Sequence, residues 1–208
     1  MRIQLALDFI TVPEAKALLA EIGDIVDIVE IGTPFVIDEG IQAVREIRDA
    51  FPGLTILADL KIMDAGEHET QSAIDAGADI VTVLGVASDA TIRACVETAG
   101  KACKEIMVDM IGVPDMEART IEVDRLGVDY ICVHTAFDVQ ATGKNPLEEL
   151  QLLRRVVKNA GAAVAGGVKI ATLPDIVREG PDIVVVGGGI TGQADRRAAA
   201  LKMKEIMG

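Results

Sequence analysis

The chain has 208 residues, 50% of them hydrophobic, so it is long and apolar enough to form one well-cored domain over residues 1–208. Its net charge of −13, its aromatic content of 2% and its lack of tryptophan exclude a nucleic-acid-binding protein, because phosphates need a basic surface and bases need aromatic platforms. No apolar run reaches the roughly 18 residues of a membrane span, and the sequence from Met1 has no signal-peptide layout. We therefore expect a cytoplasmic protein that binds no nucleic acid and no membrane.

Apolar runs that fit strands alternate with helical segments along the chain. The first predicted helix follows Thr11, a good N-cap residue with Glu14 three positions later as in a capping box. The second ends at the breaker Pro52-Gly53. The predicted strands cover 3–8, 25–31, 54–60, 79–84, 105–110, 129–133, 162–165 and 182–186, and the later helices cover 36–50, 65–76, 87–99, 115–126, 145–159, 173–178 and 194–207.

Eight strand–helix units in one chain predict the α/β class and a single-domain (β/α)8 barrel, or TIM barrel, with about 26 residues per unit. The competing doubly wound sheet typically uses five or six units. The strands are continuous Val and Ile runs, which are typical of parallel strands buried on both faces. Three joints also repeat a glycine, the expected helix cap, with an aspartate two residues later. These pairs are Gly77 and Asp79, Gly127 and Asp129, and Gly180 and Asp182.

The three cysteines have no C-x-x-C spacing, and we expect them to be reduced thiols. Cys132 lies inside an apolar strand run and is predicted to be buried. Of the two histidines, His68 falls among glutamates on a helix and is expected to face solvent. His134 ends a strand, which makes it the natural candidate for proton transfer near neutral pH.

The stretch around Asp59 brings two opposite charges to the end of the third predicted strand. Asp59 and Lys61 are two residues apart and should point to the same face of a strand. Asp64 must lie in the following loop or at the start of the next helix. A structural ion pair that closes the strand end would explain Asp59 and Lys61 alone.

Other strand ends carry charged groups as well, and a barrel gathers its strand ends at one rim. Singly, Asp8 fits a helix cap, Glu30 a solvated strand end and His134 a structural histidine. At one rim, the carboxylates of Asp8, Glu30, Asp59 and Asp109 would repel one another unless a cation or ligand compensates. Glu30 and Asp59, on neighbouring strands, can offer the oxygen ligands that Mg²⁺ prefers.

Glycine clusters follow the seventh and eighth predicted strands. They are Gly166-Gly167 and Gly187-Gly188-Gly189. An ordinary tight turn would explain either cluster alone. Barrels often bind phosphate at these two positions through backbone N–H groups, which hold an anion without any net positive charge. We therefore predict a phosphate site formed by Gly166, Gly167, Gly188 and Gly189.

The segment Asp59-Leu60-Lys61-Ile62-Met63-Asp64 resembles the D-x-K-x-x-D motif of the orotidine-monophosphate decarboxylase superfamily, and the resemblance covers essentially the whole chain. Asp8, Glu30-Ile31-Gly32-Thr33 and Gly166-Gly167 are similar to its sugar-phosphate branch. That branch contains 3-hexulose-6-phosphate synthase and 3-keto-L-gulonate-6-phosphate decarboxylase. The resemblance to the synthases is closer, through the segments Thr82-Val83-Leu84-Gly85-Val86-Ala87, Val108-Asp109-Met110-Ile111-Gly112-Val113 and Val133-His134-Thr135-Ala136-Phe137-Asp138. The decarboxylases have Glu in place of Asp109 and Arg in place of Phe137.

This resemblance implies a barrel of the ribulose-phosphate-binding type and a lyase that joins formaldehyde to D-ribulose 5-phosphate, reversibly, giving D-arabino-3-hexulose 6-phosphate. The implied metal is Mg²⁺, or alternatively Mn²⁺, on Glu30 and Asp59, stabilising an enediolate. His134 would transfer the proton and Lys61 would stabilise negative charge. In the family, the residue matching Asp64 reaches into the neighbouring subunit's site, which implies a homodimer with shared active sites. The implied substrate-binding groups are Asp8, which also has a catalytic role, Asp109 and the four glycines.

Three other readings stay open. The 3-keto-L-gulonate-6-phosphate decarboxylase would share the metal and the enediolate. A sugar-phosphate epimerase should place acid and base groups on both faces of its substrate, and the sequence does not obviously supply them. A non-catalytic sugar-phosphate-binding protein would have no need to keep Asp8, Glu30, Asp59, Lys61 and His134 together.

Overall fold

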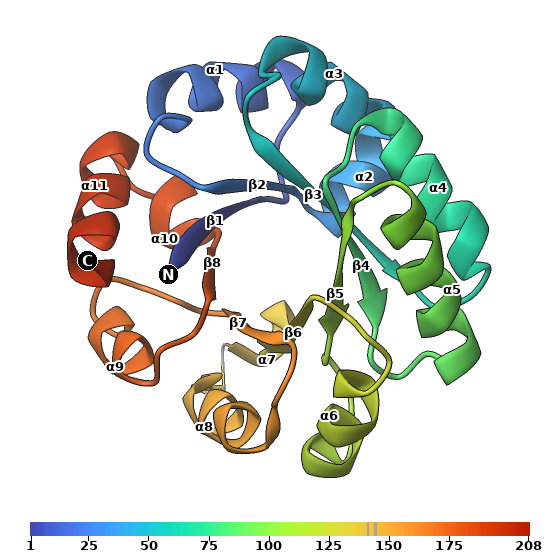
Figure 1. The fold of residues 1–208 in the computed structure, drawn as a ribbon. Coiled ribbons are helices and arrows are strands. Elements are labelled where there is room, and N and C mark those ends of the chain that lie inside the picture. The colour runs from blue at the N-terminus through green and yellow to red at the C-terminus, as the bar shows by residue number, and fades with distance from the viewer. Residues whose placement is uncertain (141, 144) are drawn as a thin grey trace.

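The computed structural model describes residues 1–140, 142–143 and 145–208, and in these ranges eight parallel strands close into a barrel (Figure 1). Each strand pairs with the next one along the chain, and β8 pairs with β1. This confirms the predicted (β/α)8 barrel. The strands are β1 (Arg2–Leu7), β2 (Ile28–Ile31), β3 (Thr55–Ile62), β4 (Ile80–Leu84), β5 (Glu105–Asp109), β6 (Tyr130–His134), β7 (Gly161–Ala165) and β8 (Ile183–Val186).

Most of the helices form a ring around the barrel, and three short additional helices, α2, α7 and α10, directly follow strands β2, β6 and β8 (Figure 1). The first helix begins after Thr11 as predicted, and the Glu14 carboxylate completes the capping box by accepting the Thr11 N–H at 2.9 Å. The helices are α1 (Val12–Ile22), α2 (Thr33–Glu39), α3 (Gln42–Ala50), α4 (Gly66–Ala76), α5 (Asp89–Lys101), α6 (Met116–Asp124), α7 (Phe137–Gln140), α8 (Leu147–Val156), α9 (Leu173–Arg178), α10 (Gly188–Thr191) and α11 (Arg196–Met207).

Three local predictions were wrong. The single helix predicted over 36–50 is two helices, because Gly40 adopts a φ of 72° and ends α2. Strand β2 begins at Ile28 rather than at residue 25. Helices α7 and α10 were not predicted, since one turn is too short to show a helical period and the glycines of α10 have low helix propensity.

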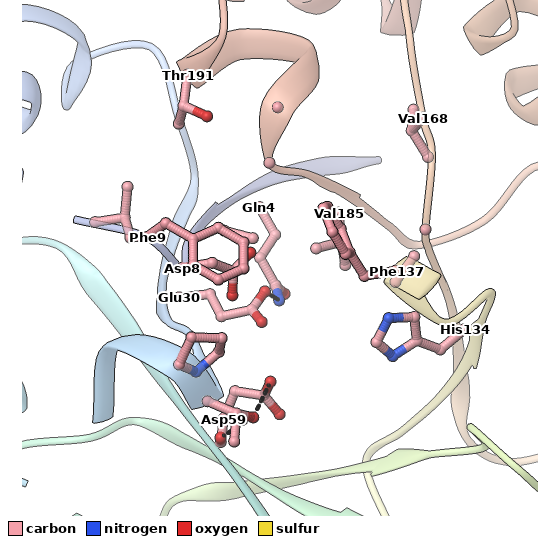
Figure 2. A pocket seen from close by; sticks show the side chains of 18 of the residues that line it. Gln4, Asp8, Phe9, Glu30, Asp59, His134, Phe137, Val168, Val185 and Thr191 are labelled. Atoms are coloured by element: carbon pink, nitrogen blue, oxygen red, sulfur yellow. Dashed lines mark hydrogen bonds between the residues drawn. The ribbon is translucent and has the colours of Figure 1, made fainter. Parts of the chain in front are cut away.

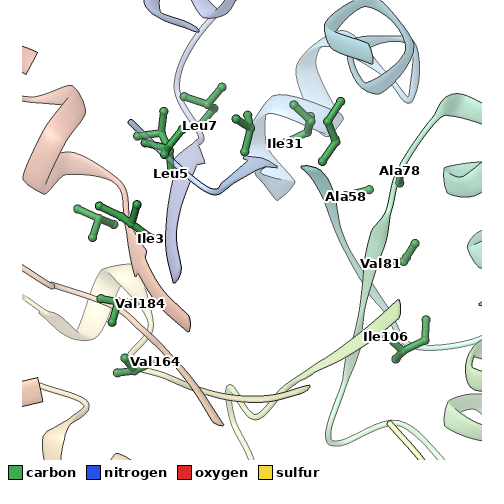
Figure 3. Packing of buried hydrophobic residues seen from close by; sticks show 14 of the residues in the cluster. Ile3, Leu5, Leu7, Ile31, Ala58, Ala78, Val81, Ile106, Val164 and Val184 are labelled. Carbon is green, nitrogen blue, oxygen red and sulfur yellow. The ribbon is translucent and has the colours of Figure 1, made fainter. Parts of the chain in front are cut away.

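Along each strand, the buried side chains alternate between two apolar layers. One set of side chains faces outward and packs under the helices, including Ile3, Leu5, Val81 and Val184 (Figure 3). The other set forms a separate cluster, as expected for the interior of a barrel. It contains Ala6, Ile28, Leu57, Ile80, Met107, Cys132, Ala163, Ala165, Ile183 and Val185. Because both strand faces are buried, the strands are mainly apolar, and their charged residues lie mostly toward their ends.

The repeated aspartates have a structural role at the opposite end of the strands. An aspartate stands directly before each of the strands β2, β4, β6 and β8. Its Oδ2 accepts the backbone N–H of the second residue of the neighbouring strand that comes earlier in the chain, at 2.7–2.9 Å. The expected glycine caps are confirmed, since Gly77, Gly127 and Gly180 have φ values of 107°, 84° and 65°. The aspartate–amide pairs are Asp27 with Ile3, Asp79 with Ile56, Asp129 with Ile106, and Asp182 with Ala162.

The cysteines and His68 have the environments that the sequence predicts. The three cysteines are free thiols, with Cys132 buried. His68 is exposed as expected. Among the described residues, no helix combines the length and the apolar character that crossing a membrane requires.

Candidate active site

A cavity of about 1100 Å³ opens at the carboxyl ends of the strands, where the charged strand ends were expected to meet. Figure 2 shows Asp8, Glu30 and Asp59 on one side of this cavity and His134 on the other. Asp64 is the one predicted site residue that does not line it. The predicted residues that do are Asp8, Glu30, Asp59, Lys61, Asp109, His134, Gly166, Gly167, Gly188 and Gly189.

The Asp59–Lys61 pair forms as predicted, although the strand that carries it is irregular. Lys61 has a φ of 48°, which is rare for a residue with a side chain. Its Nζ atom pairs with Oδ2 of Asp59 and lies 3.5 Å from Oδ2 of Asp109. Burial alone would lower the pKa of Lys61, but the charges of Asp59 and Asp109 raise it above its ordinary value. Lys61 is therefore a fixed positive charge at neutral pH.

Asp109 joins Lys61 to His134. Its Oδ2 atom lies 2.9 Å from Nδ1 of His134, and its Oδ1 accepts the Ile111 N–H at 2.9 Å. Burial would raise the pKa of Asp109, but the His134 hydrogen bond, with the charges of His134 and Lys61, holds it below its ordinary value. An ionised Asp109 favours the proton on Nδ1 of His134, which leaves Nε2 free to act as a base.

The acidic side of the cavity carries excess negative charge. Burial and the charge of Asp59 raise the pKa of Glu30 well above its usual range, and the same two causes raise the pKa of Asp8. The Gln4 amide donates to Oε2 of Glu30 at 2.6 Å, while its own Oε1 is buried with no hydrogen-bond partner among the described residues. These carboxylates fit a bound cation, because a positive charge would offset their repulsion.

The donor set matches Mg²⁺ better than a metal that needs a full protein cage. Among the described residues, no group of three or more His, Cys, Asp and Glu side chains is arranged to hold a metal ion. Glu30 and Asp59 are two buried carboxylates on neighbouring strands. Mg²⁺ is usually bound through one or two carboxylates together with waters and substrate oxygens.

The glycines after β7 and β8 fall into two kinds: at some of them the backbone leaves no room for a side chain, and at another there is open space. A Cβ on Gly166, which has a φ of 99°, would lie 2.3 Å from the Thr135 carbonyl oxygen, and one on Gly189 would lie 2.6 Å from the Val168 carbonyl oxygen. The fold therefore explains these two glycines. A Cβ on Gly188 would meet no atom within 4 Å. Gly188 borders open space in the cavity, which leaves room for a ligand.

Asp64 lies outside this cavity. It is exposed, its Oδ1 accepts the Ala65 N–H at 2.7 Å, and it lines a second cavity of about 570 Å³ with His68 and Thr91. Within one chain, Asp64 is thus separate from the other predicted site residues.

Several polar and aromatic residues at the main cavity were not predicted from the sequence. Gln4 and Thr82 interrupt apolar strands at the positions that face the barrel interior, and this period of two was the signal that could have identified them. Thr33 contacts both Asp59 and Lys61. Phe9 and Phe137 come from the segments after β1 and β6 and meet edge to face at 5.8 Å, a contact that no sequence pattern indicates.

Comparison with known proteins gives consistent results along the whole chain. The family model described as "Orotidine 5'-phosphate decarboxylase / HUMPS family" matches residues 1–203. A 3-hexulose-6-phosphate synthase of Bacillus subtilis is 56% identical, over all of this chain and 99% of the relative. A 3-hexulose-6-phosphate synthase of Staphylococcus saprophyticus is 50% identical, over all of this chain and 97% of the relative.

Solved structures agree with these sequence relationships. The 3-hexulose-6-phosphate synthase of Salmonella typhimurium superposes with a TM-score of 0.98 and is 44% identical, over all of this chain and 98% of that one. The 3-keto-L-gulonate-6-phosphate decarboxylase of Vibrio cholerae has a TM-score of 0.86 and is 26% identical, over 99% of this chain and 96% of that one.

Proposed function

The chain belongs to the orotidine 5'-phosphate decarboxylase / HUMPS family, and from this premise we propose that it is a 3-hexulose-6-phosphate synthase. In this function it joins formaldehyde to D-ribulose 5-phosphate and forms D-arabino-3-hexulose 6-phosphate, reversibly. The observation that carries the proposal is the linked set of charged groups in one cavity: Asp109 contacts both His134 and Lys61, and Lys61 in turn pairs with Asp59.

The proposed reaction begins with proton removal. Nε2 of His134 takes a proton from C1 of ribulose 5-phosphate, and the C–H electron pair forms the enediolate. C1 of the enediolate then attacks the formaldehyde carbon, a new C–C bond forms, and the formaldehyde oxygen takes the proton back from His134. Asp109 keeps the imidazole in the tautomer that this transfer requires.

Glu30 and Asp59 would hold the metal, Mg²⁺ or Mn²⁺, in the proposed enzyme. When bound, the metal supplies a positive charge that stabilises negative charge on the substrate oxygens. Lys61 adds a second positive charge, which is already fixed by its contacts with Asp59, Thr33 and Asp109. Asp8 would orient substrate hydroxyl groups at the acidic side of the cavity.

The phosphate would be held by backbone N–H groups of the glycine segments after β7 and β8, which line the same cavity. Helix α10 begins at Gly188, directly beside the open space described above. Oriented N–H groups suit this chain, because its net charge of −13 provides no general attraction for a phosphate.

A homodimer with shared active sites is the second part of the proposal. Exposed Asp64 lies next to Met63, an exposed apolar side chain, and together they offer a surface for a second copy. A sedimentation mass of two chains is expected. A mass of one chain under assay conditions would overturn this part of the proposal.

The function is tested by measuring formaldehyde consumption with ribulose 5-phosphate, with Mg²⁺ and then with excess EDTA. Carbon dioxide release from 3-keto-L-gulonate 6-phosphate is measured in parallel. The proposal expects rapid formaldehyde loss that EDTA abolishes and little carbon dioxide. Dominant carbon dioxide release would favour the decarboxylase, and binding of both sugar phosphates without turnover would indicate a non-catalytic binding protein.

A further inference from the structure

The pairing of β3 with β4 breaks where the charged residues lie. Ala58 pairs with Val81 and Ile62 pairs with Val83, so β3 advances four residues while β4 advances two. Asp59 and Lys61 lie in this irregular stretch of β3, and Thr82 lies opposite it on β4. The regular ladder therefore does not fix the backbone that carries these two charges.

Thr82 replaces the missing ladder contacts with its side chain. The backbone N–H of Lys61, at the residue with a φ of 48°, donates to Oγ1 of Thr82 at 3.0 Å. The same Oγ1 donates to Oδ1 of Asp59 at 2.7 Å. Thr82 is 3% exposed, so water cannot readily take over either bond. One hydroxyl group thus links the backbone of Lys61 to the carboxylate of Asp59.

Thr33, which follows β2, also contacts Asp59 and Lys61, but its hydroxyl group is shared among three partner atoms. Its single hydroxyl hydrogen has two acceptors at 2.8 Å, the backbone oxygen and Oδ2 of Asp59, and its Oγ1 also accepts from Nζ of Lys61. By contrast, the donor and the acceptor of Thr82 each have one described partner. Among the described hydroxyl groups, only that of Thr82 bonds both to the carboxylate of Asp59 and to the backbone of Lys61.

We propose that Thr82 is a positioning residue that sets the orientation of Asp59 and the course of the chain at Lys61 for the reaction described above. This inference rests on the proposed function, in which Asp59 binds the metal and Lys61 stabilises charge. Groups that orient metal ligands typically contribute about 10–100-fold to activity or metal affinity. Thr82→Val, which keeps the shape and removes both hydrogen bonds, should therefore lower kcat by about 10–100-fold.

The test compares Thr82→Val with Thr82→Ser, which retains the hydroxyl group. Thr82→Val should lower kcat while the KM for ribulose 5-phosphate stays unchanged, and Thr82→Ser should restore most of the lost kcat. Thr120→Val is the matched control, because Thr120 is also fully buried but lies on α6 and its hydroxyl has no partner among the described residues. The control should leave kcat unchanged.

A second readout does not depend on turnover. Mn²⁺ titration of the metal-free protein should show weaker binding to Thr82→Val than to the wild type, Thr82→Ser or Thr120→Val, because Asp59 has lost its fixed orientation. If Thr82→Val fails to fold, Thr82→Ala allows the same comparison. Normal kcat and normal Mn²⁺ affinity in the hydroxyl-free variant, or an equal loss in Thr82→Ser, would overturn the inference. A wild type without aldolase activity would overturn the proposed function instead, and the Mn²⁺ affinities would still decide the role of Thr82.

Discussion

Nδ1 of His134 lies 2.9 Å from Oδ2 of Asp109, on the neighbouring strand. Both side chains line the cavity, and the same carboxylate oxygen lies 3.5 Å from the ammonium group of Lys61. Asp109 therefore links the proposed base, His134, to the proposed charge-stabilising group, Lys61.

Replacement of His134 by Asn should lower the rate of C1-proton exchange in ribulose 5-phosphate by about 10²–10⁴-fold, the usual contribution of a general base. Asp109→Asn should also lower this rate, because an amide can donate to Nδ1 and so stabilise the wrong tautomer. Exchange is measured in heavy water without formaldehyde, which isolates proton removal from C–C bond formation. Exchange at the normal rate in His134→Asn would refute its role as the base.

Glu30→Gln should stabilise the metal-free protein at neutral pH. Because burial and Asp59 raise the folded-state pKa of Glu30, ionising this carboxyl group costs more in the folded than in the unfolded chain, and this cost grows as the pH rises toward the folded-state pKa. Glutamine removes this cost. Urea unfolding in EDTA should show a higher free energy of unfolding for the variant.

The same Glu30→Gln variant should lose the stabilisation that Mn²⁺ or Mg²⁺ gives the wild type, since ligand binding to the folded state raises its apparent stability. A variant that is less stable than the wild type in EDTA would contradict the first part of this prediction. Equal stabilisation of both proteins by the metal would contradict the second.

Gly188→Ala should raise the KM for ribulose 5-phosphate without lowering stability. The added methyl group meets no protein atom within 4 Å, so a bound phosphate is the group that it would disturb. Gly100→Ala is a matched control, because Gly100 also has open space around it but lies within α5. That control should leave the KM unchanged and stabilise the protein by up to about 1 kcal/mol through helix propensity.

Gly166→Ala provides the opposite comparison. Its Cβ would clash with the backbone at Thr135, so we expect a clear loss of stability as well as of activity. Melting temperatures and KM values measured together separate the two kinds of glycine. An unchanged KM in Gly188→Ala would show that the phosphate does not approach this residue.

Asp79→Asn should destabilise the protein by about 1–3 kcal/mol at neutral pH, because Asp79 accepts the Ile56 N–H and contacts Arg48 and Lys104. Burial would raise the pKa of Asp79, but these contacts lower it. With a lowered folded-state pKa, the stabilisation is complete above the unfolded-state value of about 3.9 and is lost as the pH falls through the folded-state pKa.

The difference in unfolding free energy between wild type and Asp79→Asn should therefore shrink in acid. Urea unfolding at pH 7 and near pH 3 measures it, with the exposed Asp75→Asn as the control that shows little change. A difference that stays constant between these pH values would contradict the assigned role of the Asp79 carboxylate.

The sequence by itself determined that the chain forms a barrel and at which end of the barrel the candidate site residues lie. Buried strands show as continuous apolar runs and helices end at glycines, so the order of elements can be predicted from local composition. The charged residues Asp8, Glu30, Asp59 and Asp109 stood out because each follows or ends an apolar strand. Parallel strands then bring such ends to one rim.

Only the tertiary structure decided which of these groups touch. His134 and Asp109 are 25 residues apart, and Gln4 and Glu30 are 26 apart, so their contacts depend on how neighbouring strands are aligned. The irregular pairing of β3 with β4, which brings Thr82 to Asp59, has no local sequence signal. Side-chain periods predict which face a residue occupies, whereas the stagger between strands depends on the packing of the whole barrel.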